Sequence, residues 1–308
     1  KRCPGRNHIE KVKCMKGKRV LIAGCGKIGL RVACELAQNN QVWGLSRTTP
    51  PQETNNLQFI CADVTQKESL GAALKHHVDQ DIDYLLYCLS PNERSEQAYR
   101  DVYLNGLKNT LEALPNHSTL KRIFFISSTS VFHQDDHEWV DESSETSPTS
   151  FSGKILLDTE ALLNSTKLPS TVIRFSGIYG GSRSRLIQQV INGEALLNEG
   201  SRLSNRIHED DCVGFILHLF QQDIIGKKVE PLYIATDNEP IDLNEVITFI
   251  AEQLNIHLTQ ATNKNAGQNA QRRRAGNKRL SNKRMLESDY QLKFPSYQQG
   301  YLEMLQHR

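Results

Sequence analysis

Three glycines near the start of the chain have the spacing of a dinucleotide-binding turn. Gly24, Gly26 and Gly29 lie in VLIAGCGKIG, where an apolar run precedes the first glycine and a helical pattern follows the last. In such a turn the first glycine allows a tight bend, the second lets the backbone approach a pyrophosphate, and the third allows close helix–sheet packing. Because the N-terminus of the following helix favours phosphate, its residues Lys27 and Ile28 join the predicted cofactor site.

The end of the next predicted strand favours NADP over NAD. NAD sites usually place Asp or Glu about 20 residues after the first glycine, where the carboxylate bonds the ribose 2′-OH. The segment WGLSRTT carries Ser46 and Arg47 there and no carboxylate. An arginine can pair with a 2′-phosphate, and a hydroxyl can donate to it. The alternative is that Arg47 is only a solvated surface residue.

A carboxylate also follows the third predicted strand. Asp63, in CADVT, is placed where a side chain or its backbone can meet the adenine of a dinucleotide. The alternative is that Asp63 or Thr65 caps the next helix. The sequence leaves both roles open.

Two other segments carry charged or metal-ligating side chains. The loop HQDDHEW at 133–139 combines two histidines with three carboxylates, which could include an acid/base or metal ligands. Nothing in its spacing defines such a site, so we predict no metal. Residues 262–286 carry eight Lys or Arg and no acid. They lack the interleaved aromatics of a base-stacking surface, so a flexible basic loop at 256–285 is favoured over a nucleic-acid site.

Short apolar runs that alternate with helical patterns must position these residues. Strands are predicted at 19–23, 41–45, 57–62, 83–89, 122–127, 170–175 and 231–235, and helices at 28–38, 66–77, 94–113, 152–165, 184–192, 210–221 and 241–254. This alternation predicts an α/β fold with a doubly wound parallel Rossmann-type sheet. We assign 15–175 plus about 206–235 to an NAD(P)-binding domain. A smaller C-terminal substrate-side lobe is predicted at about 176–205 and 236–308.

Composition excludes several classes of protein. The 308 residues carry a net charge of only +2, so the overall field gives no strong attraction to nucleic acid or membrane. Seven cysteines with no Cys-x-x-Cys pair indicate free thiols in a reducing cytoplasm. No apolar run is long enough to cross a bilayer. Residues 1–14 precede Met15 and lack periodicity, so we expect a leader upstream of the natural start, with a genuine basic arm as the alternative.

Several motifs of the chain together resemble those of a known family. They are AGCGKIG, ADVT, ISSTSVF, VDESSETSPTSFSGK, VIRFSGIYG, NRIHEDD and the closing SNKRMLESDYQLKFPSYQQGYLEML. The chain is similar to the extended short-chain dehydrogenase/reductases, the NAD-dependent epimerase/dehydratase-like branch, and to the atypical members of that branch. The resemblance runs from about residue 18 to 305. It implies a Rossmann-type oxidoreductase or epimerase-like protein.

The resemblance assigns roles to individual residues. It implies that Ser128 is the catalytic serine and that Lys154 binds the nicotinamide ribose and assists catalysis. It places Ser176, Gly177 and Tyr179 near the nicotinamide. It further implies that His208 and Asp211 fix the following helix and that Asp210 caps it.

The tyrosine of the family is missing. Its position is occupied by Ser150, and an aliphatic hydroxyl is a far weaker acid than a phenol. The ring of Phe151 has no ionisable group. A histidine of the 133–139 loop or the phenol of Tyr179 could act instead.

Two functions therefore remain open. The first is an NADP-dependent oxidoreductase or epimerase-like enzyme that acts on a carbonyl or sugar-like substrate with an unusual proton donor. The second is a catalytically silent NADP(H)-binding sensor or scaffold. A third, a nucleic-acid-associated protein that uses Arg272, Arg273 and Arg274, is disfavoured. The expected partner is a small-molecule substrate. Membrane association is not expected, and a homodimer is left open.

Overall fold

The computed structural model describes residues 17–48, 56–197, 200–258 and 277–306. Within these residues a seven-stranded parallel sheet has the order β11-β7-β5-β4-β1-β2-β3. Its strands are β1 (Arg19–Ala23), β2 (Gln41–Ser46), β3 (Leu57–Cys61), β4 (Tyr84–Tyr87), β5 (Arg122–Ser128), β7 (Ser170–Phe175) and β11 (Leu232–Ala235). The predicted α/β doubly wound fold is confirmed. Each predicted strand is present, although β4 ends at Tyr87 and not at residue 89.

The order of the strands reverses at β1. The chain runs from β1 through β2 to β3 on one side, then returns to β4 on the other side of β1. The registers pair Ile22 with Gly44 of β2 and with Leu86 of β4. Ligands of open α/β sheets bind outside the carboxyl ends of the strands at such a reversal. The carboxyl ends of β1 and β4 are therefore where a cofactor site is expected.

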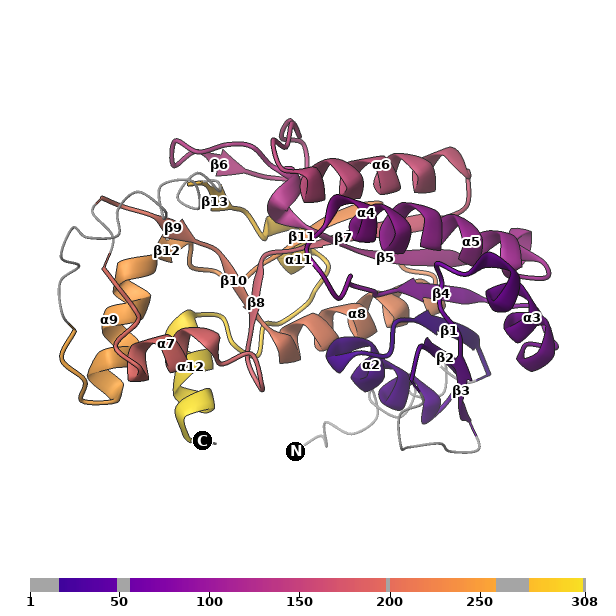
Figure 1. Cartoon of the computed structure of the whole chain (residues 1–308), viewed down its shortest axis with the longest axis horizontal. Helices are drawn as coiled ribbons and strands as arrows, with labels where there is room; N and C mark the ends of the chain where they lie inside the picture. Colours follow the sequence, from indigo (N-terminus) through magenta and orange to yellow (C-terminus); the bar gives the residue numbers. More distant parts are fainter. Residues whose placement is uncertain (1–16, 49–55, 198–199, 259–276, 307–308) are drawn as a thin grey trace, which may run out of the picture. The chain divides into compact units, whose positions relative to one another are not determined.

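The described residues divide into two compact units. The first takes those up to Ser127 together with Ser150–Ile173 and Val213–Leu232, and the second takes Ser128–Thr149, Arg174–Cys212 and those from Tyr233 on. Helices cover both faces of the sheet (Figure 1), with α4, α5 and α6 on one side and α2 and α8 on the other. Their bounds are α2 (Lys27–Ala37), α3 (Lys67–His77), α4 (Glu96–Tyr99), α5 (Gly106–Ala113), α6 (Phe151–Ser165) and α8 (Glu209–Ile224).

Aromatic side chains of the central strands form the core of the first unit. The rings of Phe124 and Phe220 lie 4.3 Å apart between centroids, and Tyr84 lies 5.5 Å from Phe220. All three side chains are at most 2% exposed. Since Phe220 belongs to α8, this cluster holds α8 against β4 and β5. Strands that are buried on both faces need the continuous apolar runs seen in the sequence.

The single helix predicted at 94–113 is wrong in one respect: a π-helical segment interrupts it. The chain forms α4, then the π-helix η1 (Arg100–Asn105), then α5. The phenol of Tyr87 donates a hydrogen bond of 2.5 Å to the carbonyl of Val102 within η1. A Cβ on Gly106 would lie against that same phenol, so only glycine allows this approach. Tyr87 thereby fixes the wide turn against the end of β4, and π-helical turns are frequent at functional sites.

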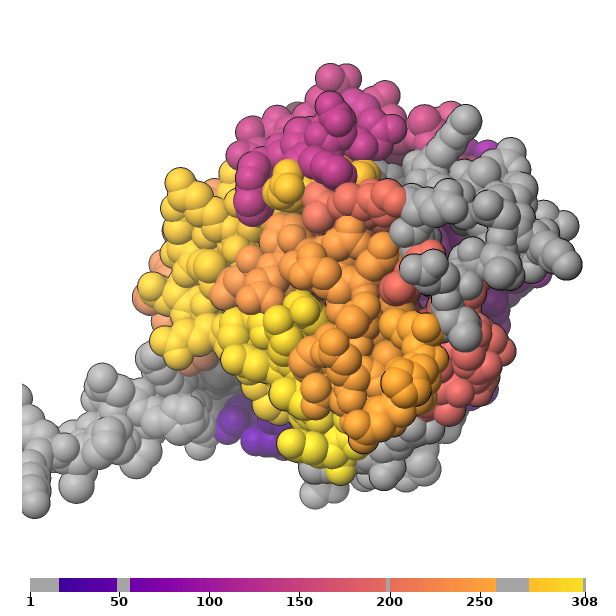
Figure 2. Space-filling model, turned by 90° about the vertical axis from the view of Figure 1, so that its left-hand side faces the viewer, coloured from indigo at the N-terminus to yellow at the C-terminus, as the bar shows by residue number. Residues whose placement is uncertain are grey.

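Short strand pairs and helices make up the described part of the second unit, which has its own core. The pairs are β8 (Gly177–Tyr179) with β10 (Arg206–His208), β9 (Leu203–Ser204) with β12 (Ile241–Asp242), and β6 (Trp139–Val140) with β13 (Arg279–Leu280). Helices α7 (Arg185–Ile191), α9 (Leu243–Gln253) and α12 (Tyr297–Gln306) pack together, and α11 (Lys283–Glu287) follows β13. Figure 2 shows α9 in orange beside α12 in yellow on one face. Within the expected basic loop, 277–285 form β13 and begin α11, while 259–276, including Arg272 to Arg274, lie outside the described residues.

A buried carboxylate fixes the C-terminal segment of the second unit. Asp211 is fully buried and accepts hydrogen bonds from the backbone N–H groups of Lys293 at 2.7 Å and Phe294 at 2.9 Å. The phenol of Tyr290 donates to it at 3.0 Å. The expected cap at Asp210 is wrong, because α8 begins at Glu209 and Asp210 lies inside its first turn. Asp211 therefore holds a distant backbone segment in place.

A second buried carboxylate is poorly satisfied. Asp237 is 1% exposed; one of its oxygens accepts from the N–H of Glu239 at 3.2 Å, and the other has no partner. Burial raises the pKa of Asp237 to about 8, against weaker opposing effects from the Glu239 N–H and from Arg206. A carboxyl group with this pKa is protonated in the folded chain at neutral pH.

The titration of Asp237 should make the second unit less stable as the pH rises. Between about pH 4 and pH 8 the folded chain holds a proton that the unfolded chain has released, so the free energy of unfolding decreases through that window. Asp237→Asn removes the titration. In melting curves, the advantage of this variant over the wild type should grow from pH 5 to pH 9. Parallel pH profiles would contradict this assignment.

Candidate functional site

The glycine turn after β1 is shaped by contacts at two of its three glycines. Gly24 has a φ of +107°, and a Cβ there would overlap the carbonyl of Cys88, just beyond β4. A Cβ on Gly29 would overlap the carbonyl of Gly24. Gly26 is exposed, and no atom lies within 4 Å of the place its Cβ would take. Two glycines therefore allow close packing of the turn, and the third leaves open space before the helix.

The N-terminus of α2 is open to an anion. Its N-cap is Gly26, which makes no side-chain capping bond, and the first turn carries no acidic residue. The first N–H groups of a helix have no partner within the helix, and the helix dipole favours negative charge there. Ile28 is buried under this turn and Lys27 is exposed. These features fit the pyrophosphate of a dinucleotide at the carboxyl end of β1.

Arg47 extends from the end of β2 across the end of β1. Its side chain is exposed and donates a hydrogen bond of 2.5 Å to Asn92, in the segment after β4. Since β1 lies between β2 and β4, this bond joins the segments that follow the two strands beside β1. Ser46 donates to the carbonyl of Thr48. Both residues named by the sequence thus lie at the expected edge of the sheet.

Asp63 lies at the neighbouring end of β3. Its carboxylate accepts the N–H of Thr65 at 2.9 Å and closes a turn. The N-cap of α3 is Gln66, so the alternative in which Asp63 or Thr65 caps this helix is wrong. One oxygen of Asp63 therefore fixes the turn that follows β3.

Ser150, at the position of the missing tyrosine, is a helix cap. Its hydroxyl accepts the N–H of Gly153 at 3.1 Å and lies 3.2 Å from the hydroxyl of Ser152, at the start of α6. The next residue, Phe151, places its ring edge-on to Tyr99, with centroids 5.4 Å apart. Ser150 therefore has a structural role at the start of α6.

Lys154 lies in the first turn of α6 and is exposed. Within the described part of the chain its amine makes no hydrogen bond or ion pair, while the backbone N–H of Lys154 bonds the carbonyl of Ser150. An ammonium with three unused donors can bind the hydroxyls of a ribose. Beneath it, the buried hydroxyl of Ser127 donates to Glu160 at 2.7 Å and ties β5 to α6.

In the second unit, Ser128 is the last residue of β5, and because side chains alternate along a strand it points away from the side taken by Ser127. The hydroxyl of Ser128 accepts the N–H of Ser130 at 3.2 Å and caps a short 3-10 helix, Thr129–Val131. That hydroxyl keeps its proton free to donate. Ser128 thus has a local structural role that does not consume its hydrogen.

The other candidates of the second unit are mostly structural. Tyr179 is 5% exposed and stacks on Tyr301 with centroids 4.7 Å apart, so its phenol lies in the core of that unit. Burial raises the pKa of Tyr179 far above its usual value. In the loop 133–139, the carboxylate of Glu138 accepts the N–H of Asp136 at 2.7 Å. Across the described residues, no group of three His, Cys, Asp or Glu side chains is arranged to hold a metal ion.

Sequence patterns missed two features. The first is Lys278, a buried lysine whose amine donates to the carbonyl of Phe132 at 3.2 Å, and whose pKa is lowered by burial. The second is the pair Tyr99 and Tyr103 around η1, with ring centroids 5.6 Å apart. A spacing of four residues between aromatics was the only available signal for that pair.

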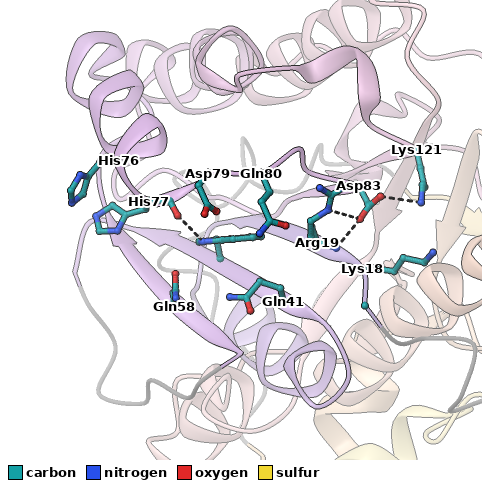
Figure 3. Close-up of a pocket in the computed structure, with 12 residues that line it drawn as sticks. Lys18, Arg19, Gln41, Gln58, His76, His77, Asp79, Gln80, Asp83 and Lys121 are labelled. Carbon is teal, nitrogen blue, oxygen red and sulfur yellow. Dashed lines mark hydrogen bonds and ion pairs between the residues drawn. The ribbon is translucent and has the colours of Figure 1, made fainter.

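A cavity of about 680 Å³ lies at the opposite edge of the sheet, near the amino ends of the strands. Figure 3 shows Asp83 in it between Arg19 and Lys121, at 3.2 Å and 2.9 Å. Burial alone would raise the pKa of Asp83, but hydrogen bonds from Arg19 and Lys121 lower it below the usual value. The Asp83 carboxylate is therefore held in ion pairs with Arg19 and Lys121. This cavity is remote from the end of the sheet where ligands of doubly wound folds bind.

Comparisons with known proteins agree with this geometry. The model of the "NAD dependent epimerase/dehydratase family" matches residues 20–232. A Methylobacillus flagellatus protein provisionally described as an NAD-dependent epimerase/dehydratase is 37% identical, with a TM-score of 0.77 over 94% of this chain and 98% of that one. Among curated proteins the comparison found no match.

More distant structures share the fold. UDP-glucuronic acid 4-epimerase from Bacillus cereus, in complex with NAD, is 19% identical with a TM-score of 0.71, over 93% of this chain and 99% of that one. UDP-glucose 4-epimerase from Thermotoga maritima is 15% identical with a TM-score of 0.73, over 94% and 99%. The sheet and its glycine turn define a Rossmann-type α/β protein. More narrowly, the chain belongs to the NAD-dependent epimerase/dehydratase family. No helix of the described residues is long and apolar enough to span a membrane.

The capping role of Ser150 can be tested by stability. Ser150→Ala should lower the free energy of unfolding by about 1 kcal/mol, because the N–H of Gly153 loses its partner. Ser150→Asp should retain most of the stability, since a carboxylate also caps a helix. Denaturant unfolding measures both. Equal stability of Ser150→Ala and the wild type would show that the cap contributes nothing.

Proposed function

We propose that this chain is an NADP-dependent oxidoreductase or epimerase-like enzyme that acts on a carbonyl or sugar-like substrate. The observation that carries the proposal is the open glycine turn and uncapped α2 at the strand reversal, in the same unit as the unpartnered ammonium of Lys154. A bound nicotinamide dinucleotide supplies the hydride chemistry. The residues that would hold it are Gly24, Gly26, Lys27, Ile28, Gly29, Ser46, Arg47, Asp63 and Lys154.

The preference for NADP rests on Arg47. A guanidinium spans the end of β1, and the end of β2 offers Ser46 and no carboxylate to a ribose 2′-OH. A carboxylate would repel a 2′-phosphate, whereas a guanidinium makes charge-assisted hydrogen bonds to it. NAD is the alternative cofactor against which NADP must be tested, because the Bacillus cereus structure contains NAD.

In the proposed reaction, Ser128 donates its hydroxyl proton in a hydrogen bond to the substrate oxygen, and Lys154 orients the ribose of the cofactor. Hydrogen-bond donors aimed at an oxygen on which negative charge develops lower the barrier. Distant relatives are named for UDP-glucose, UDP-glucuronic acid and dTDP-glucose, so nucleotide sugars form the first substrate panel.

A second candidate function is a silent NADP(H)-binding sensor or scaffold. The observation that favours it is the conversion of the tyrosine position into the cap of α6. Such a protein would keep the glycine turn and Lys154 for binding alone. It differs from the enzyme in showing tight cofactor binding with no turnover.

The cofactor assignment predicts selective loss of affinity in one variant. Arg47→Ala should weaken NADPH binding by about tenfold or more, because a charge-assisted hydrogen bond contributes about 1.5–3 kcal/mol. NADH binding should change little. Fluorescence titration of both nucleotides on both proteins measures this. Equal weakening of NADPH and NADH would remove the argument for NADP.

The enzyme and the silent protein are separated by turnover. NADPH oxidation with simple aldehydes and ketones, and sugar NMR with the nucleotide-sugar panel, should detect activity in the wild type. Lys154→Ala and Ser128→Ala should each reduce it by about 100-fold. Lys75→Ala, an exposed lysine on α3, serves as the control and should remain active. Tight binding without turnover of any substrate would favour the sensor.

A further inference from the structure

The first unit contains four tyrosines, and two of them have a structural role. Tyr84 is 2% exposed and packs in the aromatic core. Tyr87 donates its hydroxyl to the carbonyl of Val102. Within the described residues, Tyr99 and Tyr103 make ring contacts only, and their hydroxyls have no hydrogen-bond partner. These two phenols are therefore free to meet a ligand.

Tyr103 lies at the carboxyl ends of the central strands. Its ring meets Phe125 of β5 edge-on, with centroids 6.4 Å apart. Phe125 pairs in register with Tyr87, the last residue of β4, so the ring of Tyr103 lies beside the carboxyl end of that strand. Burial, followed by the Tyr99 phenol and the Cys88 thiol, raises the pKa of Tyr103. The carbonyl of Cys88 is the group against which Gly24 packs. Tyr103 thus borders the strand reversal that carries the glycine turn.

The π-helix brings Tyr103 to this position. The Tyr87 phenol and the close approach of Gly106 hold the wide turn on the end of β4, one residue from Tyr103. On its other side, η1 packs against α6, the helix that begins after Ser150 and carries Lys154. Tyr99, one α-helical turn earlier, contacts Phe151. The aromatic cluster thereby connects the vacated tyrosine position to Tyr103.

We propose that the Tyr103 hydroxyl replaces the missing tyrosine and donates a hydrogen bond, then its proton, to the oxygen of the substrate. This inference rests on the proposed function. When a carbonyl is reduced, its carbon gains a hydride from the reduced dinucleotide and its oxygen gains the phenolic proton, which solvent restores. A protonated phenol can donate both the hydrogen bond and the proton. Tyr179, the alternative phenol, is stacked in the core of the second unit.

A spectroscopic test can locate Tyr103 relative to the nicotinamide without a known substrate. Fluorine NMR of chain labelled with 3-fluorotyrosine gives one signal per tyrosine, and Tyr103→Phe and Tyr99→Phe identify two of them. Oxidised nicotinamide carries a positive charge that the reduced ring lacks. The Tyr103 signal should therefore differ between the NADP⁺ and NADPH complexes, and the Tyr99 signal should differ less. Identical Tyr103 signals in the two complexes would overturn the proposal.

Kinetics give the second readout. Tyr103→Phe should lose about 100-fold in turnover while its affinity for NADPH stays within about twofold of the wild type. Tyr99→Phe, the matched control, should keep the wild-type rate. Wild-type turnover in Tyr103→Phe would overturn the proposal. Absence of turnover by a wild type that binds NADPH would instead reject the proposed enzyme activity, and the fluorine signals of the two complexes would still decide where Tyr103 lies.

Discussion

The contact between the glycine turn and the end of β4 is the constraint on which the site depends. Gly24 packs on the carbonyl of Cys88, and Gly29 packs on the carbonyl of Gly24. Any side chain at either position would push β1, α2 and β4 apart. The contact lies where the strand order reverses, between the ends of β1 and β4. The close packing of the backbone and the open position in front of α2, where a dinucleotide is proposed to bind, therefore both depend on the glycine turn.

Aromatic side chains hold the segment between β4 and α5 in place. Tyr87 holds η1, Phe125 supports Tyr103, and Phe151 meets Tyr99. Serine hydroxyls at 128 and 150 both accept backbone N–H groups at the start of a helix.

The sequence predicted the sheet, its strands and the glycine turn because these depend on local patterns of apolar residues and glycine. It also located Arg47 and Lys154 correctly on the elements that carry them. It could not predict the π-helix, since that turn depends on a phenol 15 residues away in the chain. The same reason hid the burial of Lys278 and the distant backbone partners of Asp211. Tertiary contacts of this kind leave no periodic signal.

The cap at Ser150 ties this position to the folding of α6. The Ser150 hydroxyl accepts the N–H of Gly153 in the first turn, so the residue contributes to stability whether or not the chain catalyses a reaction. A side chain that cannot accept this hydrogen bond would leave the start of α6 without its cap. A phenol introduced at position 150 would therefore need a second change that caps the helix.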